Sequence, residues 1–351
     1  MMKLNRILAI SLVVAIGLLV VPAIQVKADY DTAYNLYKAK KYSEAIPLLE
    51  EWCNKYPKDP RGGYTLAQCY VKTKQNAKAL QRLQIVLEHH PDHSPSQFLM
   101  GMLTLGDSPE KALPHFKSAV EASPDNGTYH YYYGSALMAA KKYNEAIPAL
   151  KQAVQINPKD GRAQLDLGKV LLLADKPQEA VKHLEIASKG KKDKDSALYY
   201  LGLAHLQTKD YAAAETALGS AAQINPKDDK ILYNLGLARE GALGGTAGSV
   251  DACQPMIDAY GQAVTLDPGN ADYQMRLGNA YEIAARSIYE KTAGNQGLSS
   301  QAIDLLENAR KAYAVAVAAD AGSPAGDRIS GVEQMIENIK NPQIIEEEVH
   351  Q

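Results

Sequence analysis

Four side chains that can bind metal ions gather around one proline, and they are the first candidates for chemistry in this sequence. His89, His90, Asp92 and His93 flank Pro91. Imidazole nitrogens and carboxylate oxygens are ligands that zinc accepts in proteins. The same residue types are equally typical of a polar, exposed turn. Of these two alternatives, a metal site and a solvated turn, we predict the turn, with no metal bound.

Signatures of the known catalytic types are absent from the sequence. It contains no nucleophile elbow and no histidine pair at the spacing of a zinc-binding helix. Gly168 and Lys169 match the end of a phosphate-binding loop, but Val170 follows where that loop requires a serine or threonine hydroxyl. The sequence therefore predicts no catalytic residue, no cofactor and no enzymatic activity.

Three cysteines, Cys53, Cys69 and Cys253, are too few and too odd in number for a disulfide framework. Cys53 and Cys69 fall on two consecutive antiparallel helices that we expect to join near Pro57. Their positions differ by about 7 Å along the helix axes, in addition to a helix separation of about 8–10 Å. A disulfide requires Cα atoms within about 7 Å of each other. We therefore predict buried, unpaired thiols.

The first 28 residues have the pattern of a secretory signal peptide. Lys3 and Arg6 precede an apolar run over 7–21, and Ala28 ends a small-residue cleavage pattern. The run is shorter than the ~20 residues that cross a bilayer, so we expect cleavage after Ala28 rather than a retained anchor. The mature chain is then predicted to be periplasmic or secreted, with no stable membrane anchor.

Charge and aromatic content restrict the kind of partner. Lys and Arg number 38 against 40 Asp and Glu, a net charge of −2, so nothing favours binding to nucleic acid. The aromatic residues are 21 Tyr, 2 Phe and 1 Trp. Tyrosine tolerates a position half in water, which suits a binding surface.

A small residue recurs at intervals of 34, 34, 33, 34, 34, 34 and then 42 residues. Two helices of about a dozen residues with two turns fill such an interval, and a small residue marks their close approach. A proline then ends the second helix, with Lys192 where one proline is missing. The first small residues are Ala33, Ala67, Gly101, Gly134, Gly168, Gly202, Gly236 and Gly278; the second are Ala45, Ala79, Ala112, Ala146, Ala180 and Ala214; the prolines are Pro57, Pro91, Pro124, Pro158, Pro226 and Pro268.

This pattern resembles the tetratricopeptide repeat family, in which a Leu-Gly pair in the first helix is followed by an Ala in the second helix and a closing Pro. The pairs Leu167-Gly168, Leu201-Gly202, Leu235-Gly236 and Leu277-Gly278 match that signature. Thr32-Ala33 in the first repeat and Met256 in the seventh depart from it. The resemblance implies an all-α, right-handed α-solenoid, a superhelix of about eight helical hairpins over 29–321.

Two insertions and a terminal helix complete the predicted organisation. Glycine-rich stretches at 241–248 and 294–297 lengthen the turns of repeats seven and eight; such loops are either functional or tolerated extras. Apolar residues at helical spacing predict a capping helix over 325–340, followed by a flexible acidic tail over 341–351. The apolar residues of this helix are Ile329, Val332, Met335, Ile336 and Ile339.

The resemblance also implies a binding surface, because in this family the first helices line a concave side where ligands lie. The resemblance places on that side the residues that stand three positions before, or one position after, each small residue. These positions predict a largely aromatic stripe that binds a ligand. The alternative is that the rings only pack on the next hairpin. The candidate ligand-binding residues are Tyr30, Tyr34, Tyr64, Phe98, Tyr131, Lys169, Tyr199 and Tyr233.

We therefore expect a non-catalytic scaffold of the cell envelope that binds a protein or an extended peptide on the concave surface. The family's clamp for a terminal carboxylate is not expected, because Tyr and Leu replace its cations and only Arg61, Arg162 and Lys169 lie nearby. The alternative is a carbohydrate-handling or exopolysaccharide-export accessory module, since tyrosine faces also stack on sugar rings. Polysaccharide is thus the second candidate partner.

Overall fold

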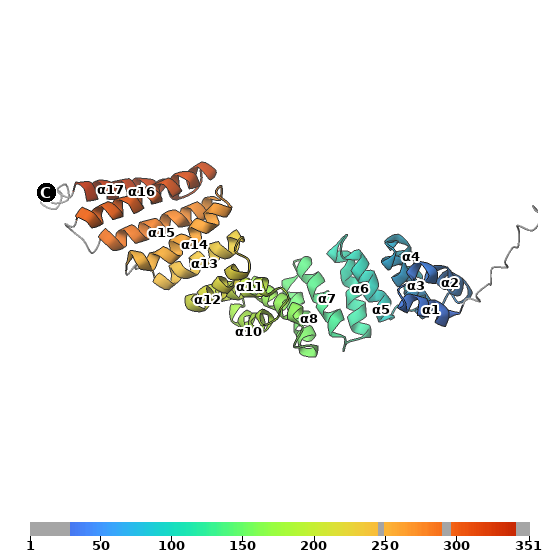
Figure 1. The fold of residues 1–351 in the computed structure, drawn as a ribbon. Coiled ribbons are helices and arrows are strands. Elements are labelled where there is room, and N and C mark those ends of the chain that lie inside the picture. The colour runs from blue at the N-terminus through green and yellow to red at the C-terminus, as the bar shows by residue number, and fades with distance from the viewer. Residues whose placement is uncertain (1–28, 245–248, 290–295, 342–351) are drawn as a thin grey trace, which may run out of the picture. The chain divides into compact units, whose positions relative to one another are not determined.

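The computed structural model describes residues 29–244, 249–289 and 296–341, and within these residues every regular element is a helix (Figure 1). The predicted all-α fold is confirmed. The helices are α1 (Tyr30–Lys38), α2 (Tyr42–Lys55), α3 (Pro60–Lys72), α4 (Asn76–His89), α5 (Ser94–Thr104), α6 (Pro109–Ala122), α7 (Gly127–Ala139), α8 (Tyr143–Ile156), α9 (Gly161–Leu173), α10 (Pro177–Ser188), α11 (Lys194–Gln207), α12 (Tyr211–Ile224), α13 (Asp229–Leu243), α14 (Val250–Leu266), α15 (Ala271–Tyr289), α16 (Gln296–Ala319) and α17 (Ala325–Lys340).

Helices α1 to α16 pair in chain order as eight hairpins. The chain forms two compact units, residues 1–124 with helices α1 to α6 and residues 125–351 with helices α7 to α17. Within each unit the second helix of one hairpin packs against the first helix of the next. Each unit is therefore an α-solenoid, as predicted. Among the helices that the structure describes, none combines the length and the apolar character needed to cross a bilayer.

The recurring small residues lie where two helices come closest. A Cβ added to Gly168 would lie 2.4 Å from Leu184 Cγ, and one added to Gly202 would lie 2.4 Å from Leu218 Cγ. Neither position leaves room for a side chain, because real Cβ atoms do not approach so closely. The spacing of small residues was therefore a correct guide to the hairpins.

In repeats seven and eight, the side chain that packs against the small glycine is a tyrosine instead of a leucine. Gly236 packs against the ring of Tyr260, and Gly278 against the ring of Tyr313. Both rings are fully buried, so each hydroxyl needs an acceptor inside the protein. The Tyr260 hydroxyl donates to Glu240 Oε2 at 2.5 Å, and the Tyr313 hydroxyl donates to Glu282 Oε2 at 2.9 Å.

Both kinds of turn have a local chemical basis. Inside a hairpin, Lys40 has a positive φ of 61°, and the Lys41 amide donates to Leu36 O, which is the hydrogen bond of a Schellman motif. At four of the turns between hairpins, a carboxylate or amide side chain caps the next helix, because the first amides of a helix have no partner within it. These caps are Asp59, Asn126, Asp160 and Asp228.

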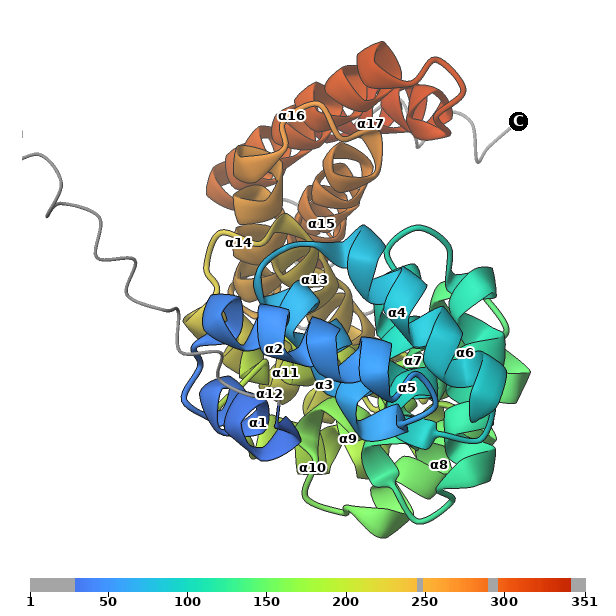
Figure 2. The same ribbon diagram turned by 90° about the vertical axis from the view of Figure 1, so that its right-hand side faces the viewer.

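The predicted C-terminal capping helix is present as α17. Val332 and Ile336 are buried, and Ile329, Met335 and Ile339 pack on the same core as Leu306 and Tyr313 of α16. Helices α15, α16 and α17 lie side by side in both views (Figure 2). Helix α17 thus covers the side of the last hairpin on which no further hairpin packs.

The prediction for the second insertion was partly wrong. It was expected as a loop, but α15 continues for eleven residues beyond Gly278 to Tyr289, and Gln296 and Gly297 belong to α16. The extra residues thus largely lengthen the two helices, which gain additional packing. Residues 245–248 and 290–295 of the two insertions lie outside the described residues, as do the predicted signal peptide (1–28) and residues 342–351 of the predicted tail.

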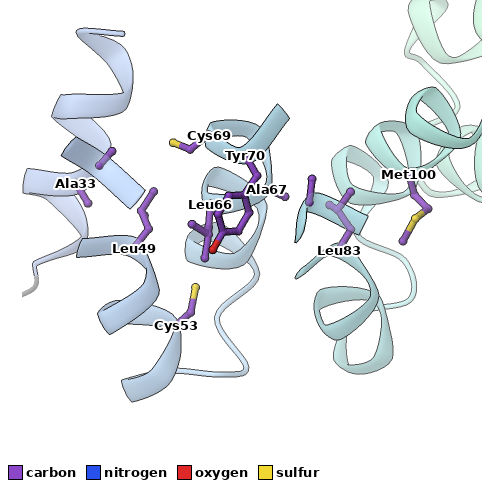
Figure 3. Packing of buried hydrophobic residues seen from close by; sticks show 11 residues of the cluster. Ala33, Leu49, Cys53, Leu66, Ala67, Cys69, Tyr70, Leu83 and Met100 are labelled. Carbon is purple, nitrogen blue, oxygen red and sulfur yellow. The ribbon is translucent and has the colours of Figure 1, made fainter. Parts of the chain in front are cut away.

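The three cysteines are buried free thiols, as predicted. Cys53 and Cys69 lie apart, on either side of Leu66 in the first core cluster (Figure 3). Burial raises the pKa of both thiols to about 11. Their role is packing, because a thiol with so high a pKa is a poor nucleophile.

Candidate functional site

Several first helices contact the first helix of the next hairpin. Helix α1 contacts α3 in the first unit, and α7, α9, α11 and α13 make successive contacts in the second. The side chains that these helices do not bury against neighbouring helices form a continuous surface along each of these two series. We call it the first-helix surface, and all eight predicted binding residues lie on first helices.

Six aromatic rings form a continuous series in the first unit, which we call the aromatic ladder. Successive ring centroids are 5.8, 5.9, 5.6, 5.7 and 4.3 Å apart. The ladder runs through Tyr42, Tyr37, Tyr34, Tyr30, Trp52 and Tyr56. Sequence reasoning found Tyr30 and Tyr34 and missed the other four, three of which belong to α2 or its C-terminal end.

The position of Trp52 could have been found from its neighbours in the sequence. Seven residues after the second small residue, the hairpins of α6, α8, α10 and α12 carry Ala, whereas the first hairpin carries Trp52. Helix α3 compensates with Gly62, where an added Cβ would lie 2.4 Å from Trp52 Cδ1. A large residue in one repeat opposite a glycine in the next is the signal.

Arg61 is held against Tyr30 by its own helix cap. The Arg61 guanidinium lies 5.2 Å from the centre of the Tyr30 ring, a cation–π distance. Its Nε and Nη2 atoms donate to Asp59 Oδ1 and Oδ2 at 3.1 and 3.2 Å. Burial opposes ionisation of Asp59, but hydrogen bonds from Arg61 and Trp52 outweigh it and hold the carboxyl pKa below its usual value.

The same arrangement recurs in the second unit. Arg162 lies 5.1 Å from the centre of the Tyr131 ring, and its Nη2 atom donates to Asp160 Oδ2 at 3.3 Å. Burial, with the nearby Asp166 carboxylate, raises the pKa of Tyr131 to about 12, so the phenol stays protonated. Each of these tyrosines therefore has an arginine over one face of its ring.

Asp166 on α9 interacts with both Tyr131 on α7 and Lys169 on its own helix. It accepts a hydrogen bond from Ser135 Oγ on α7 at 3.1 Å, and Lys169 Nζ lies 3.6 Å from its Oδ1 atom. Lys169 Nζ is also 5.0 Å from the centre of the Tyr200 ring on α11. The structure thus brings two of the predicted residues, Tyr131 and Lys169, into one polar and aromatic cluster.

The other predicted residues have ring neighbours within their own units. Tyr64 lies 5.7 Å from His93, Phe98 lies 5.8 Å from Phe116, Tyr199 lies 5.2 Å from Tyr200, and Tyr233 lies 4.8 Å from Tyr273. All four are half-buried. Packing and binding are both compatible with half-burial, so their role in binding stays a prediction.

The imidazoles near Pro91 point to separate partners. His90 Nε2 lies 2.6 Å from Lys58 O, and His93 Nδ1 lies 2.8 Å from Ser96 Oγ. His89 Nδ1 lies 3.3 Å from Ile85 O of its own helix. In the parts of the chain described above, no three His, Cys, Asp or Glu residues converge as metal ligands do.

Stacked helical hairpins with an open first-helix surface define a helical-repeat protein of the α-solenoid class. Tetratricopeptide repeat models match residues 36–103 and 137–206, residues 103–161, and residues 196–228. These matches together cover more than half of the sequence without a gap. The chain belongs to the tetratricopeptide repeat family.

Solved structures with a similar fold include MamA from residue 41 onward of Desulfovibrio magneticus RS-1, at 20% identity over 50% of this chain and 95% of that chain, with a TM-score of 0.45. A crystal structure of MamA protein has 23% identity over 54% of this chain and 92% of that chain, with a TM-score of 0.43. YrrB, described as a TPR protein with an unusual peptide-binding site, has 17% identity over 58% of this chain and 96% of that chain, with a TM-score of 0.44. A comparison with curated protein sequences finds no match.

Proposed function

We propose that this protein is a non-catalytic scaffold that binds a segment of another protein on its first-helix surface, outside the cytoplasm in a cell-envelope complex. One observation carries the proposal. In the second unit, tyrosine and cationic side chains from α7, α9 and α11 form one half-exposed cluster across successive repeats. A surface made by several repeats suits a ligand that extends along them.

The geometry favours a peptide over a polysaccharide as the ligand. Sugars stack on open aromatic faces, but Arg61, Arg162 and Lys169 already cover one face of Tyr30, Tyr131 and Tyr200. In the aromatic ladder, Tyr30 and Tyr34 are stacked on each other at an interplanar angle of 15°. The guanidinium N–H groups that Asp59 and Asp160 leave free suit hydrogen bonds to the main chain and side chains of a peptide.

Alanine at Tyr131 and at Tyr199 tests this function. Both changes remove a half-exposed ring from the first-helix surface, so each is expected to weaken partner capture by about tenfold, with helix content unchanged. Capture from envelope extract by the mature chain is measured, with circular dichroism as the folding check. Tyr143→Ala, a half-buried ring at the start of the second helix α8, is the matched control.

Two results would contradict this proposal. Equal capture by Tyr131→Ala, Tyr199→Ala and the unchanged protein would remove these rings from the binding site. Retardation in gels containing polysaccharide, abolished by the same two variants, would establish the carbohydrate alternative instead.

The proposed location rests on the first 28 residues alone. The basic and apolar pattern ending at Ala28 leads us to expect a mature protein that begins at Asp29 and is found outside the cytoplasm. Cell fractionation of the native protein measures its location, and N-terminal sequencing measures where the mature chain begins. Full-length protein in the cytoplasmic fraction would contradict this location while leaving the binding function open.

A further inference from the structure

The turn between α10 and α11 differs from the other six turns that connect successive hairpins. Each of those six consists of four residues with a proline at the second position. The turn between α10 and α11 consists of five residues, 189–193, and contains Gly190 but no proline. Its last residue, Asp193, has a positive φ of 53°, and the Asp193 side chain makes no capping hydrogen bond to α11. This turn therefore lacks both the proline and the side-chain cap that restrict the turns before α9 and α13.

The same turn presents a group of lysines to solvent. The exposed lysines in and beside it are Lys189, Lys191, Lys192 and Lys194. Exposed turns of small and polar residues are the places where proteases cut folded proteins most readily. Serine proteases select the side chain that precedes the cleaved bond in a specificity pocket, which is acidic in trypsin. The lysines of this turn can therefore reach such a pocket.

The described residues contain three Lys-Lys pairs that are all exposed but differ in backbone structure. Two of them, Lys40-Lys41 and Lys141-Lys142, lie in turns within hairpins. In both pairs the first lysine is left-handed, with φ of 61° and 58°. The amide of the second lysine donates to Leu36 O at 2.9 Å in one pair and to Leu137 O at 2.8 Å in the other. The bond between the two lysines is thus part of a hydrogen-bonded Schellman motif.

The third pair, Lys191-Lys192, has no such restraint. Both of its lysines have negative φ, and the amides of Lys192 and Asp193 donate no hydrogen bond within the described part of the chain. An extended peptide bound along a protein surface uses its main-chain groups for hydrogen bonds to that surface. A protease can therefore bind the chain around Lys191 without first breaking a turn, whereas the other two pairs must open locally.

We propose that the Lys191-Lys192 bond is a cleavage site at which serine proteases that select lysine cut the folded protein. Hydrolysis consumes one water molecule, breaks the C–N bond, and leaves a carboxylate on Lys191 and an amino group on Lys192. The bond lies between α9 and α11, whose Lys169 and Tyr200 side chains meet in the candidate site. Cleavage therefore divides the chain within that cluster, although the inference itself does not depend on the proposed function.

Limited digestion of the folded mature chain with trypsin tests the site. Mass spectrometry of the new N-termini measures the initial cleavage rate at each of the three Lys-Lys bonds. We expect the Lys191-Lys192 bond to be cut at least about tenfold faster than either of the others, because cleavage of those bonds depends on the small population of locally open turns. Digestion of the chain unfolded in urea should remove this preference.

Two variants separate the turn from its surroundings. Lys191→Gln should abolish the cut between residues 191 and 192, because glutamine carries no charge for the acidic pocket. Lys141→Gln is the matched control, since it removes an exposed lysine from a Lys-Lys pair inside a hairpin. It should leave the rate at the Lys191-Lys192 bond unchanged. Circular dichroism confirms that both variants fold.

The rates in the folded chain decide the outcome. Equal initial rates at the three Lys-Lys bonds, or faster cleavage of Lys40-Lys41 or Lys141-Lys142, would overturn the cleavage site. So would a preference for Lys191-Lys192 that persists unchanged in urea, because it would then come from the local sequence and not from the folded backbone. None of these results changes the expectation for partner capture by Tyr131→Ala.

Discussion

At the scale of the residue, the clearest relation in this molecule joins a large side chain to a glycine in the following repeat. Trp52 occupies a site where other hairpins carry alanine, and Gly62 leaves the space that its ring fills. The Trp52 indole also donates to Asp59 Oδ2 at 3.0 Å, the carboxylate that orients Arg61. One substitution at Trp52 thus affects packing, a helix cap and the first-helix surface together.

Gly62→Ala tests this relation. The added Cβ would overlap the Trp52 ring, so we expect a loss of about 1–3 kcal/mol of unfolding free energy, the usual cost of overpacking. Urea unfolding measures it. In a Trp52→Ala background the cost of the same change should largely disappear, because the overlapping ring is gone.

Gly219→Ala is the control for the Gly62 experiment. No atom lies within 4 Å of a Cβ added to Gly219 in the middle of α12, so this change should stabilise the protein by about 0.5–1 kcal/mol. A Gly62→Ala protein as stable as Gly219→Ala would show that the ring moves aside freely.

At the scale of the element, the hairpins could be predicted from the sequence, but the backbone conformation of their turns could not. Spacing and proline positions predicted where each helix pair begins and ends. The left-handed residues were not predicted, since lysine rather than glycine occupies them at Lys40, Lys74, Lys141 and Lys209. A lysine gives no compositional signal for positive φ, and the hydrogen bonds of the Schellman motif become visible only in the folded turn.

These lysines are expected to be suboptimal for stability. Lys74→Gly should raise the unfolding free energy by about 0.5–1 kcal/mol, because glycine adopts φ near 61° without a clash from Cβ. Lys72→Gly, two residues earlier at the last residue of α3, should instead lower it by about 0.5 kcal/mol. Thermal unfolding compares the two variants. Equal shifts of the unfolding temperature in the same direction would contradict the idea that the positive φ at Lys74 costs stability.

At the scale of the whole molecule, repetition made the fold predictable, and the aromatic and cationic contacts of the candidate site only partly so. Six intervals of 33 or 34 residues and a seventh of 42 predict eight hairpins, and the apolar spacing after Asp327 predicts α17. Tyr131 and Lys169 were found because first-helix positions transfer between repeats. Trp52 and Tyr56 were missed because they come from a second helix and its end, and their contact with Tyr30 depends on tertiary packing.

A shared property of three half-buried histidines predicts how the stability of the protein depends on pH. Burial lowers the pKa of His93, His115 and His183 below the value of about 6.5 that histidine has in an unfolded chain. The Nδ1 atoms of His115 and His183 lie 2.8 and 2.7 Å from glutamine Oε1 acceptors, which fits a neutral ring that donates from Nδ1. The folded state therefore favours the uncharged form.

The sign of the pH dependence follows from proton binding. Just below pH 6.5 the unfolded chain binds more protons at these histidines than the folded chain, so unfolding becomes easier as pH falls, until the pH passes below the folded pKa values. We expect urea midpoints to decrease between pH 7.5 and 5.5, well above the range where carboxylates titrate. Replacing His115 and His183 by glutamine should reduce that slope. An unchanged slope in the double variant would mean that other groups dominate in this range.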